Sequence, residues 1–378
     1  MLSSQSITIP RYYSDTFVLV LFVILFAIQR PETLLGCYAL SAFYVFFNWK
    51  LLSIKKSFFL MYLWFVLLCI PAVSLFNHSS TPLMYLILSP LLVLFASVYS
   101  TQGILAITKS LKYLFWTLVA LTFIGVFSSD SAEPLEGLIP GTSTNGIPSY
   151  IIVIYIAYAI ASILSAKYVS TRGAIATLSI AIIGLGRGSI IIATLLLFFS
   201  FCFKAYTSKV RFAYKFSLFF TLTFVFISYI VYNITSLQLA AELAIESSKF
   251  ANGVLDEHRA RILADYMDKI NWLQLLLGAD YGGTSIVTQY GGNPHNSYIR
   301  VHSFYGIWGL ISVFLPFTFI FLKKIKWQYK ISILFLILCA LARALTEPIF
   351  FPSMLDFFYI LYFIMFFSHY NALHLRSD

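Results

Sequence analysis

Apolar segments of bilayer-spanning length recur from one end of the chain to the other, and they limit its fold more than any other feature. Each is close to the roughly 20 residues that a transmembrane helix needs. Only 11% of the residues are charged, against about 25% in soluble domains. The sequence therefore predicts an all-α polytopic membrane protein with about twelve transmembrane helices, at residues 14–29, 33–49, 57–76, 82–100, 111–128, 148–166, 171–186, 188–204, 213–233, 303–322, 328–345 and 351–368.

The charged residues alternate with these segments. Most of the 25 Lys and Arg side chains fall in every second connection, whereas nearly all of the 15 acidic side chains fall in the others. Because cytoplasmic loops are enriched in Lys and Arg, both termini are predicted to be cytoplasmic. The alternation also requires a break at 184–189 (GLGRGS). Since the net charge of +10 comes from short clusters between apolar segments, it argues for a lipid bilayer and against a nucleic acid as partner.

Two connections on the non-cytoplasmic side are longer than a turn, at 129–147 and 234–302. The second divides the chain into helices one to nine (1–233), a large loop (234–302) and the last three helices (303–378). Within the loop, 236–253 and 256–277 have helical spacing. The rest, 278–299, is glycine-rich and is typical of a binding loop.

The four cysteines give no sign of a metal or disulfide site. Cys37, Cys69, Cys202 and Cys339 stand alone inside apolar stretches, so they are interpreted as core or lipid-facing residues. No metal-binding motif such as HExxH is present either. Neither a metal nor another cofactor is expected.

The stretch 291–309, GGNPHNSYIRVHSFYGIWG, places polar residues directly before an apolar segment. His295 is a candidate general base because histidine titrates near neutral pH, and Asn296 is its neighbour. The alternative is that His295 only anchors the helix at the membrane interface. His302 lies deeper and is interpreted as structural more than substrate-binding.

Arginines supply the remaining candidates. Arg187 lies between two apolar runs, where a charge is costly and usually functional or paired. Arg259 and Arg261 match phosphate binding, or else form a solvated helix face. Arg343 and Glu347 are four residues apart, so they either pair with each other or line a cavity. Arg300 is included as a substrate-binding candidate, although it fits a solvated role better.

Three short motifs resemble those of bacterial O-antigen ligases and Wzy-type O-antigen polymerases. PHNSYIRVHSFYGIWG is similar to the family pattern His-[Asn/Ser/Gln]-x9-Gly-x-x-Gly, from His295–Asn296 to Gly306 and Gly309. GLGRGSIIIATLL resembles the arginine-containing helix before the large loop. HRARILADYMDKI resembles the loop segment whose arginine is Arg259 here, with Arg261 as the alternative register. The predicted layout of twelve helices and one large loop agrees with this family.

The resemblance implies a C-type glycosyltransferase fold in the bacterial inner membrane. The expected substrate is an undecaprenyl-diphosphate-linked oligosaccharide at the periplasmic face, used with inversion and without a metal. Arg187 and Arg259 would clamp the diphosphate, with Arg343 as a third cation, and His295 would take the acceptor proton while Asn296 holds it. A membrane protein that regulates chain length is an expected partner.

The motifs fit both members of this family. A polymerase transfers the growing chain onto another lipid-linked repeat, whereas a ligase transfers it onto the lipid A core. RALTEPIFFPS after the eleventh segment and the abundance of Phe, Ile, Tyr and Lys favour the polymerase. A multispan transporter of the same lipid-linked glycan is the alternative from another class. It would need charged residues at mid-membrane and internal symmetry, and the sequence has neither.

Overall fold

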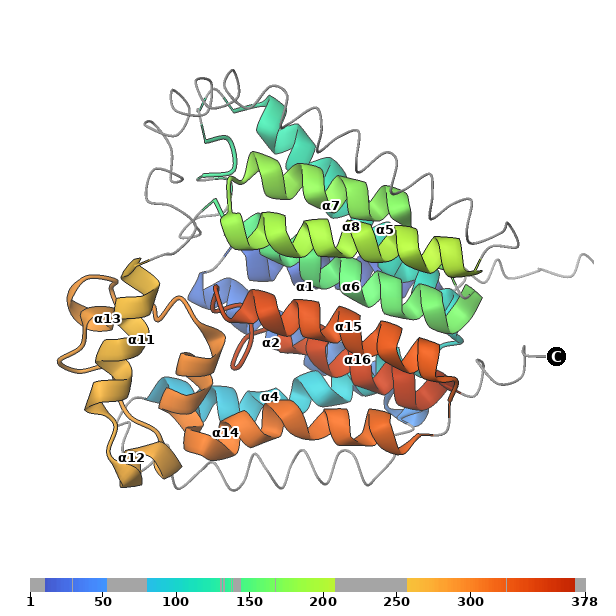
Figure 1. Cartoon of the computed structure of the whole chain (residues 1–378). Coiled ribbons are helices and arrows are strands. Elements are labelled where there is room, and N and C mark those ends of the chain that lie inside the picture. The colour runs from blue at the N-terminus through green and yellow to red at the C-terminus, as the bar shows by residue number, and fades with distance from the viewer. Residues whose placement is uncertain are drawn as a thin grey trace, which may run out of the picture.

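The computed structural model describes residues 11–28, 30–52, 80–129, 131, 133–136, 138, 144–166, 168–207, 257–323 and 325–370. Across these residues every regular element is helical (Figure 1). In chain order the elements are α1 (Arg11–Ala27), α2 (Pro31–Phe47), η1 (Trp49–Leu51), α4 (Ser80–Tyr99), α5 (Ile104–Phe127), α6 (Gly146–Ala166), α7 (Thr171–Ile183), α8 (Arg187–Thr207), α11 (Glu257–Lys269), α12 (Trp272–Leu277), α13 (Ser285–Thr288), α14 (Ser297–Leu322), α15 (Trp327–Ala344) and α16 (Asp356–His369).

The helices confirm a helical membrane protein. Among the described residues, α5, α6, α8, α14 and α15 are long and apolar enough to cross a bilayer, and shorter apolar helices accompany them. Each predicted segment that falls in the described ranges overlaps one helix, and α7 and α8 are separated at the predicted break. The predicted segments 57–76, 213–233 and 236–253 lie outside the described residues.

Three of the described helices begin five or more residues away from their predicted starts, the first being α5, which begins at Ile104 instead of 111. α14 begins at Ser297 instead of 303, so the predicted domain boundary at 302 lies inside this helix. α16 begins at Asp356 instead of 351. The Asp356 carboxylate accepts hydrogen bonds from the backbone N–H groups of Phe351 and Ser353, both at 2.9 Å, and this holds the preceding residues in a loop.

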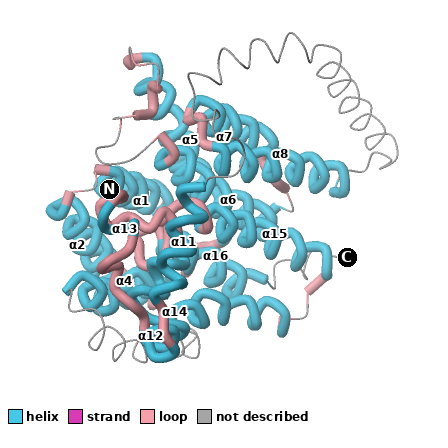
Figure 2. Tube along the Cα trace, turned by 60° about the vertical axis from the view of Figure 1, so that its left-hand side comes forward, coloured by secondary structure: helices cyan, strands magenta, loops and turns pink. Residues whose placement is uncertain are grey.

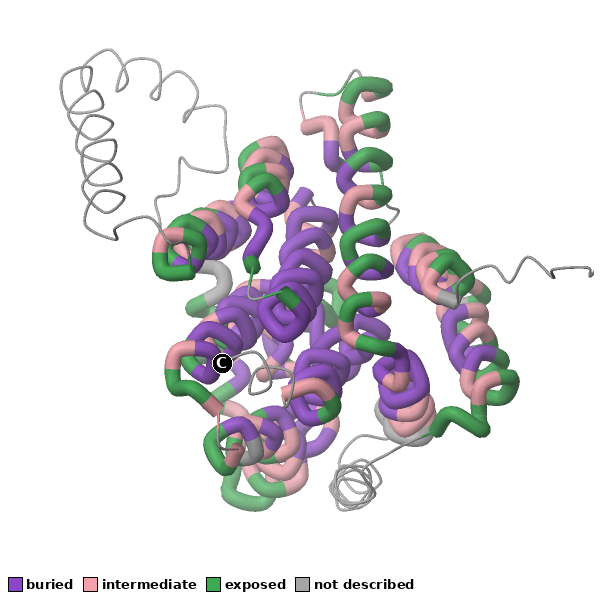
Figure 3. The backbone as a smooth tube through the Cα atoms, turned by 90° about the vertical axis from the view of Figure 1, so that its right-hand side faces the viewer, coloured by how far each residue is buried: buried purple, intermediate pink, exposed green. Residues whose placement is uncertain are grey.

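The centre of the bundle is formed by α6 and α16. Every residue of α6 from Ile147 to Ser165 except Tyr150 is buried, as is every residue of α16 from Asp356 to Phe367. A helix that is apolar on all sides is typical of a position surrounded by other helices. Figure 3 shows the buried residues gathered in the middle and the exposed residues on the outer helix faces. The Tyr362 hydroxyl joins the two helices by donating to the Val153 carbonyl at 2.7 Å.

A cap, residues 257–296, lies beyond one end of the bundle and contains α11, α12 and α13 (Figure 1, Figure 2). The predicted helical stretch 256–277 is divided at Asn271, whose side chain caps α12 by accepting from the Gln274 N–H at 2.9 Å. The cap has a small apolar core of its own, which also includes one residue of α14. Its buried members are Ile262, Tyr266, Ala279, Ile286 and Ile299.

Two glycines allow the cap to pack closely against the bundle. Gly306 has φ 60° inside α14, where it kinks the helix, and a Cβ there would overlap the Leu276 carbonyl of α12. Gly278 has φ 95°, and its Cβ would lie 2.5 Å from the Ser303 carbonyl oxygen. Glycine tolerates positive φ and has no Cβ. The first glycine of the Gly-x-x-Gly motif therefore has a packing role.

Candidate functional site

Segments far apart in the sequence meet at the cap end of the bundle, meaning the helix ends next to the cap. The Arg343 guanidinium, at the end of α15, donates to the Thr346 hydroxyl and, at 3.5 Å, to the Asn145 carbonyl just before α6. A Cβ on Gly188, near the start of α8, would lie 3.4 Å from Arg343 Nη1. The structure therefore places the Arg187–Gly188 end of α8 beside Arg343.

Arg343 is one of the most deeply buried large side chains, with 1% of its surface exposed. Glu347, which lies beyond the end of α15, places a carboxylate oxygen 3.6 Å from Arg343 Nη2. Buried charges are normally paired, because an isolated ion loses its hydration without compensation. Of the two predicted alternatives for Arg343 and Glu347, the structure contains the mutual pair. The separate hydrogen bond from Arg343 to the Asn145 carbonyl links the end of α15 to the start of α6.

Arg187 is the first residue of α8. The N-terminus of a helix carries a partial positive charge, so an arginine there adds to the existing field instead of cancelling it. The turn before Arg187 is tightly packed, since a Cβ on Gly186 would overlap the Asn145 side chain and one on Gly184 would meet Pro148 and the Thr144 carbonyl oxygen. The predicted break between α7 and α8 therefore concentrates positive potential at the cap end.

His295 and Asn296 form the junction between the cap and α14. The Asn296 side chain caps α14 by accepting from the N–H groups of Tyr298 at 2.7 Å and Ile299 at 3.2 Å. Its amide oxygen is thus used by the helix, and only its NH2 group remains for the predicted contact with substrate or His295. His295 is half-buried, has φ 49°, and packs edge-on against Tyr290 with ring centroids 5.7 Å apart.

Two residues that the sequence did not single out for this role join α14 to the loop after α15. The Ser297 hydroxyl donates to the Glu347 carbonyl at 2.9 Å and accepts from the Phe350 N–H at 3.1 Å. Arg300 Nη2 donates to the carbonyls of Pro348 at 2.6 Å and Phe350 at 2.8 Å. Ser297 thereby brings the His295 segment next to Glu347. Arg300 thus helps to hold this junction, and its substrate-binding role stays a prediction.

His302 belongs to the packing between the cap and the bundle. It is 5% exposed, and its Nε2 lies 3.0 Å from the Leu275 carbonyl, which can only accept. Nδ1 is therefore the acceptor from the Tyr266 hydroxyl, 2.9 Å away. Burial raises the pKa of Tyr266 above its ordinary value, so this donor keeps its proton. These contacts fit the structural interpretation of His302, and its inclusion among the substrate-binding candidates stays a prediction.

The two arginines of the cap lie on α11. Arg261 is exposed to solvent. Arg259 lies in the first turn of the same helix, and its side chain is outside the described part of the structure. The structure therefore brings Arg187, Arg343, Glu347 and the segment around His295 together.

Comparison of the chain with known proteins identifies no related protein. No family model, curated protein or solved structure matches the chain. Among the described residues no three His, Cys, Asp or Glu side chains lie close enough together to hold a metal ion. The chemistry of the cap end is therefore argued from its own residues: fixed guanidinium groups, the N-terminus of an apolar helix, and a half-buried imidazole beside them.

Proposed function

We propose that the protein is an O-antigen polymerase. It would transfer a growing glycan from undecaprenyl diphosphate onto a second lipid-linked repeat unit, without a metal. One observation carries the proposal. Arg187 at the N-terminus of α8 lies beside the buried Arg343, and Ser297 ties the His295 segment to the same loop. Cations and a candidate base are thus grouped at one end of a membrane bundle, where a lipid-linked diphosphate would present its headgroup.

The electrostatics fit a diphosphate leaving group. When the bond between the sugar and the phosphate oxygen breaks, negative charge grows on the diphosphate. Cations and helix dipoles that are already in place stabilise this charge without reorganising, which is usually the largest single contribution to catalysis. Arg187 and the start of α8 supply such a field, and Arg259 at the start of α11 is proposed as the second clamp residue. Arg343 supports the site by holding Asn145 and Glu347 in place.

The proposed reaction is a single displacement. The acceptor hydroxyl oxygen forms a bond to the anomeric carbon, and the bond from that carbon to the phosphate oxygen breaks. The electron pair of the broken bond leaves with the diphosphate, and the hydroxyl proton passes to the His295 imidazole. Attack from the side opposite the leaving group inverts the anomeric configuration. A positioned base of this kind contributes roughly 10²–10⁴-fold to the rate.

The same proposal includes the topology. The chain would cross the bacterial inner membrane twelve times, with both termini in the cytoplasm and the cap in the periplasm. The excess of Lys and Arg in alternate connections supports this orientation. A membrane protein that regulates chain length is a proposed partner, because the reaction itself contains no step that ends elongation.

Purified protein with a defined undecaprenyl-diphosphate-linked repeat unit tests the function. We expect a ladder of lipid-linked products that differ by one repeat, and its loss in Arg187→Ala. Transfer only onto an added lipid A core acceptor would instead identify a ligase. A substrate left chemically unchanged, but moved across the membrane of a vesicle, would identify a transporter.

A further inference from the structure

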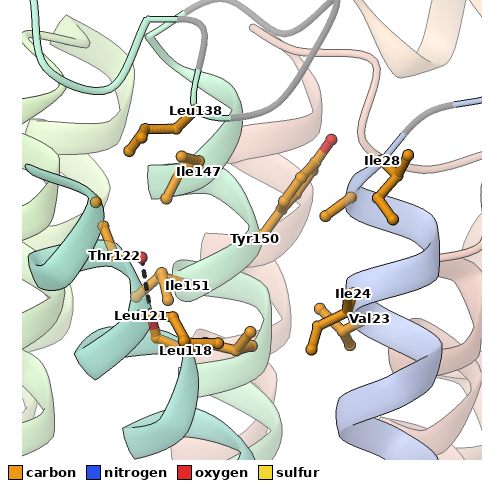
Figure 4. A pocket seen from close by; sticks show the side chains of 12 residues that line it. Val23, Ile24, Ile28, Leu118, Leu121, Thr122, Leu138, Ile147, Tyr150 and Ile151 are labelled. Carbon is orange, nitrogen blue, oxygen red and sulfur yellow. Dashed lines mark hydrogen bonds between the residues drawn. The ribbon is translucent and has the colours of Figure 1, made fainter. Parts of the chain in front are cut away.

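An apolar groove opens between α1, α5 and α6, beside the loop that contains Leu138 (Figure 4). Its volume is about 280 Å³, near the lower end of the roughly 300–1,000 Å³ of small-molecule sites. Ile24 of α1 and Ile28 just after it face Leu121 of α5 and Ile147 of α6 across the groove. The Thr122 hydroxyl donates to the Leu118 carbonyl at 2.8 Å, so it leaves the wall apolar.

The groove adjoins the cationic cluster through α6. Ile147 lines the groove, and Asn145, two residues earlier, accepts the hydrogen bond from Arg343. The loop before α6 connects the two regions a second time. Leu138 of this loop packs over Gly125 in the groove, and Leu135 packs against Gly184 in the turn before α8. The groove therefore begins beside the residues proposed to hold the diphosphate.

The groove extends along the bundle axis. Its α5 wall runs from Leu118 to Gly125, about 10 Å at the rise of 1.5 Å per helical residue. Tyr150 stands at one end with its hydroxyl turned away from the Ile151 wall (Figure 4). An elongated apolar groove linked through Asn145 to a cationic cluster matches a ligand that has an anionic head and a hydrocarbon tail.

We propose that this groove holds the first isoprene units of the polyprenyl diphosphate, with the diphosphate at Arg187. This assignment rests on the proposed function and specifies where the carrier lipid lies. A bilayer is as apolar as the groove, so the tail gains little from leaving the lipid; shape and van der Waals packing decide the contact. The main effect of the groove is accordingly to orient the bound lipid so that the anomeric carbon of its sugar faces the cap. Its effect on the affinity for the lipid is small.

Photocrosslinking tests the position of the tail directly and without turnover. p-Benzoylphenylalanine replaces Leu121, which is 47% exposed in the groove, or Ile124, which is 61% exposed on the same helix and does not line it. The full-length protein is reconstituted in phospholipid nanodiscs with radiolabelled undecaprenyl diphosphate. We expect capture from position 121 and at least fivefold less from position 124. Excess unlabelled undecaprenyl diphosphate should compete, and excess phospholipid should not.

A second variant fills the groove. In Gly125→Phe the new Cβ meets only the flexible end of Leu138, and the ring is meant to fill the groove, so capture at position 121 should fall severalfold. Ile124→Phe on the neighbouring outer face is the matched control and should leave it unchanged. Equal capture at both positions, or competition by phospholipid, would show that ordinary acyl chains occupy the groove and overturn the proposal.

The outcomes also separate this proposal from the proposed function. If undecaprenyl diphosphate binds, and Arg187→Ala weakens the binding, but position 121 captures nothing, then the tail lies elsewhere and only the groove assignment is wrong. If undecaprenyl diphosphate does not bind the protein, both proposals are wrong.

Discussion

Arg187 is placed where a positive charge is electrostatically unfavourable for the helix, at the first residue of α8. Such a position is consistent with an anionic ligand, because the guanidinium and the helix N-terminus then act on the same negative charge. The sequence alone pointed to this residue, since an arginine between two apolar runs is rarely incidental.

Arg187→Ala should reduce polymer formation by at least about 10²-fold, the usual effect of removing one preorganised charge-stabilising donor. Arg172→Ala is the matched control: Arg172 is an exposed arginine in the first turn of α7, and its loss should leave the product ladder unchanged. The ladder is measured with equal amounts of purified protein. A wild-type ladder from Arg187→Ala would remove this residue from the mechanism.

His295→Ala should lower the rate roughly 10²–10⁴-fold if the imidazole accepts the acceptor proton. The base must be neutral, so wild-type activity should fall towards acidic pH. His295→Ala should keep a residual activity that lacks this pH step. Initial rates between pH 5 and 8 check both statements, and a flat wild-type profile would contradict the role of base.

Tyr266→Phe tests whether His302 is structural. Removing the hydroxyl that donates to His302 should lower the free energy of unfolding by about 1–3 kcal/mol, because a buried acceptor is left unsatisfied. Because burial raises the pKa of Tyr266, the wild-type contribution should persist up to about pH 10 and decline only above it. Thermal unfolding in detergent measures the loss. Activity per folded molecule should stay near wild type. A loss of activity without a loss of stability would indicate that His302 takes part in substrate binding.

The helices were predictable to the extent that they depend on local composition. The apolar segments and the break at 184–189 required only length, hydropathy and charge alternation. The start of α14 depends instead on the cap formed by the Asn296 side chain, and the loop before α16 also depends on a long-range contact between Phe350 and Ser297. No local pattern distinguishes an asparagine that contacts substrate from one that caps a helix, and for this reason Asn296 was assigned to the substrate alone.

The kink in α14 gives a prediction at the level of elements. Gly306→Ala should prevent the cap from docking, because the new Cβ would overlap the Leu276 carbonyl at a positive φ. Gly283 is the matched control, since it also has a positive φ of 78° but nothing lies within 4 Å of its Cβ. Gly283→Ala should cost only about 1–2 kcal/mol. Yields of folded protein and limited proteolysis within 257–296 compare the two, and equal effects would contradict the packing role.

In the whole molecule, the candidate site is assembled from the starts of α6, α8 and α14 and the end of α15. These segments are separated by long stretches of sequence, so no single motif predicts that they lie next to each other. Residue type was enough to nominate Arg187, Arg343 and His295. It could not show that Arg343 is bound to Asn145 and Glu347, because that depends on how the helices pack.

The acceptor distinguishes the proposed polymerase activity from a ligase activity, and it can be identified in cells. Deletion of the gene in a strain with an intact lipid A core should leave core molecules that carry a single repeat, because the ligase remains while elongation is lost. Restoring the gene should return the full ladder, and restoring Arg187→Ala should not, whereas Arg172→Ala should. Gel analysis of lipopolysaccharide and of the carrier-linked pool distinguishes the cases. Polymer that accumulates on the lipid carrier, with a bare core, would mean that this chain performs the final transfer and not the elongation.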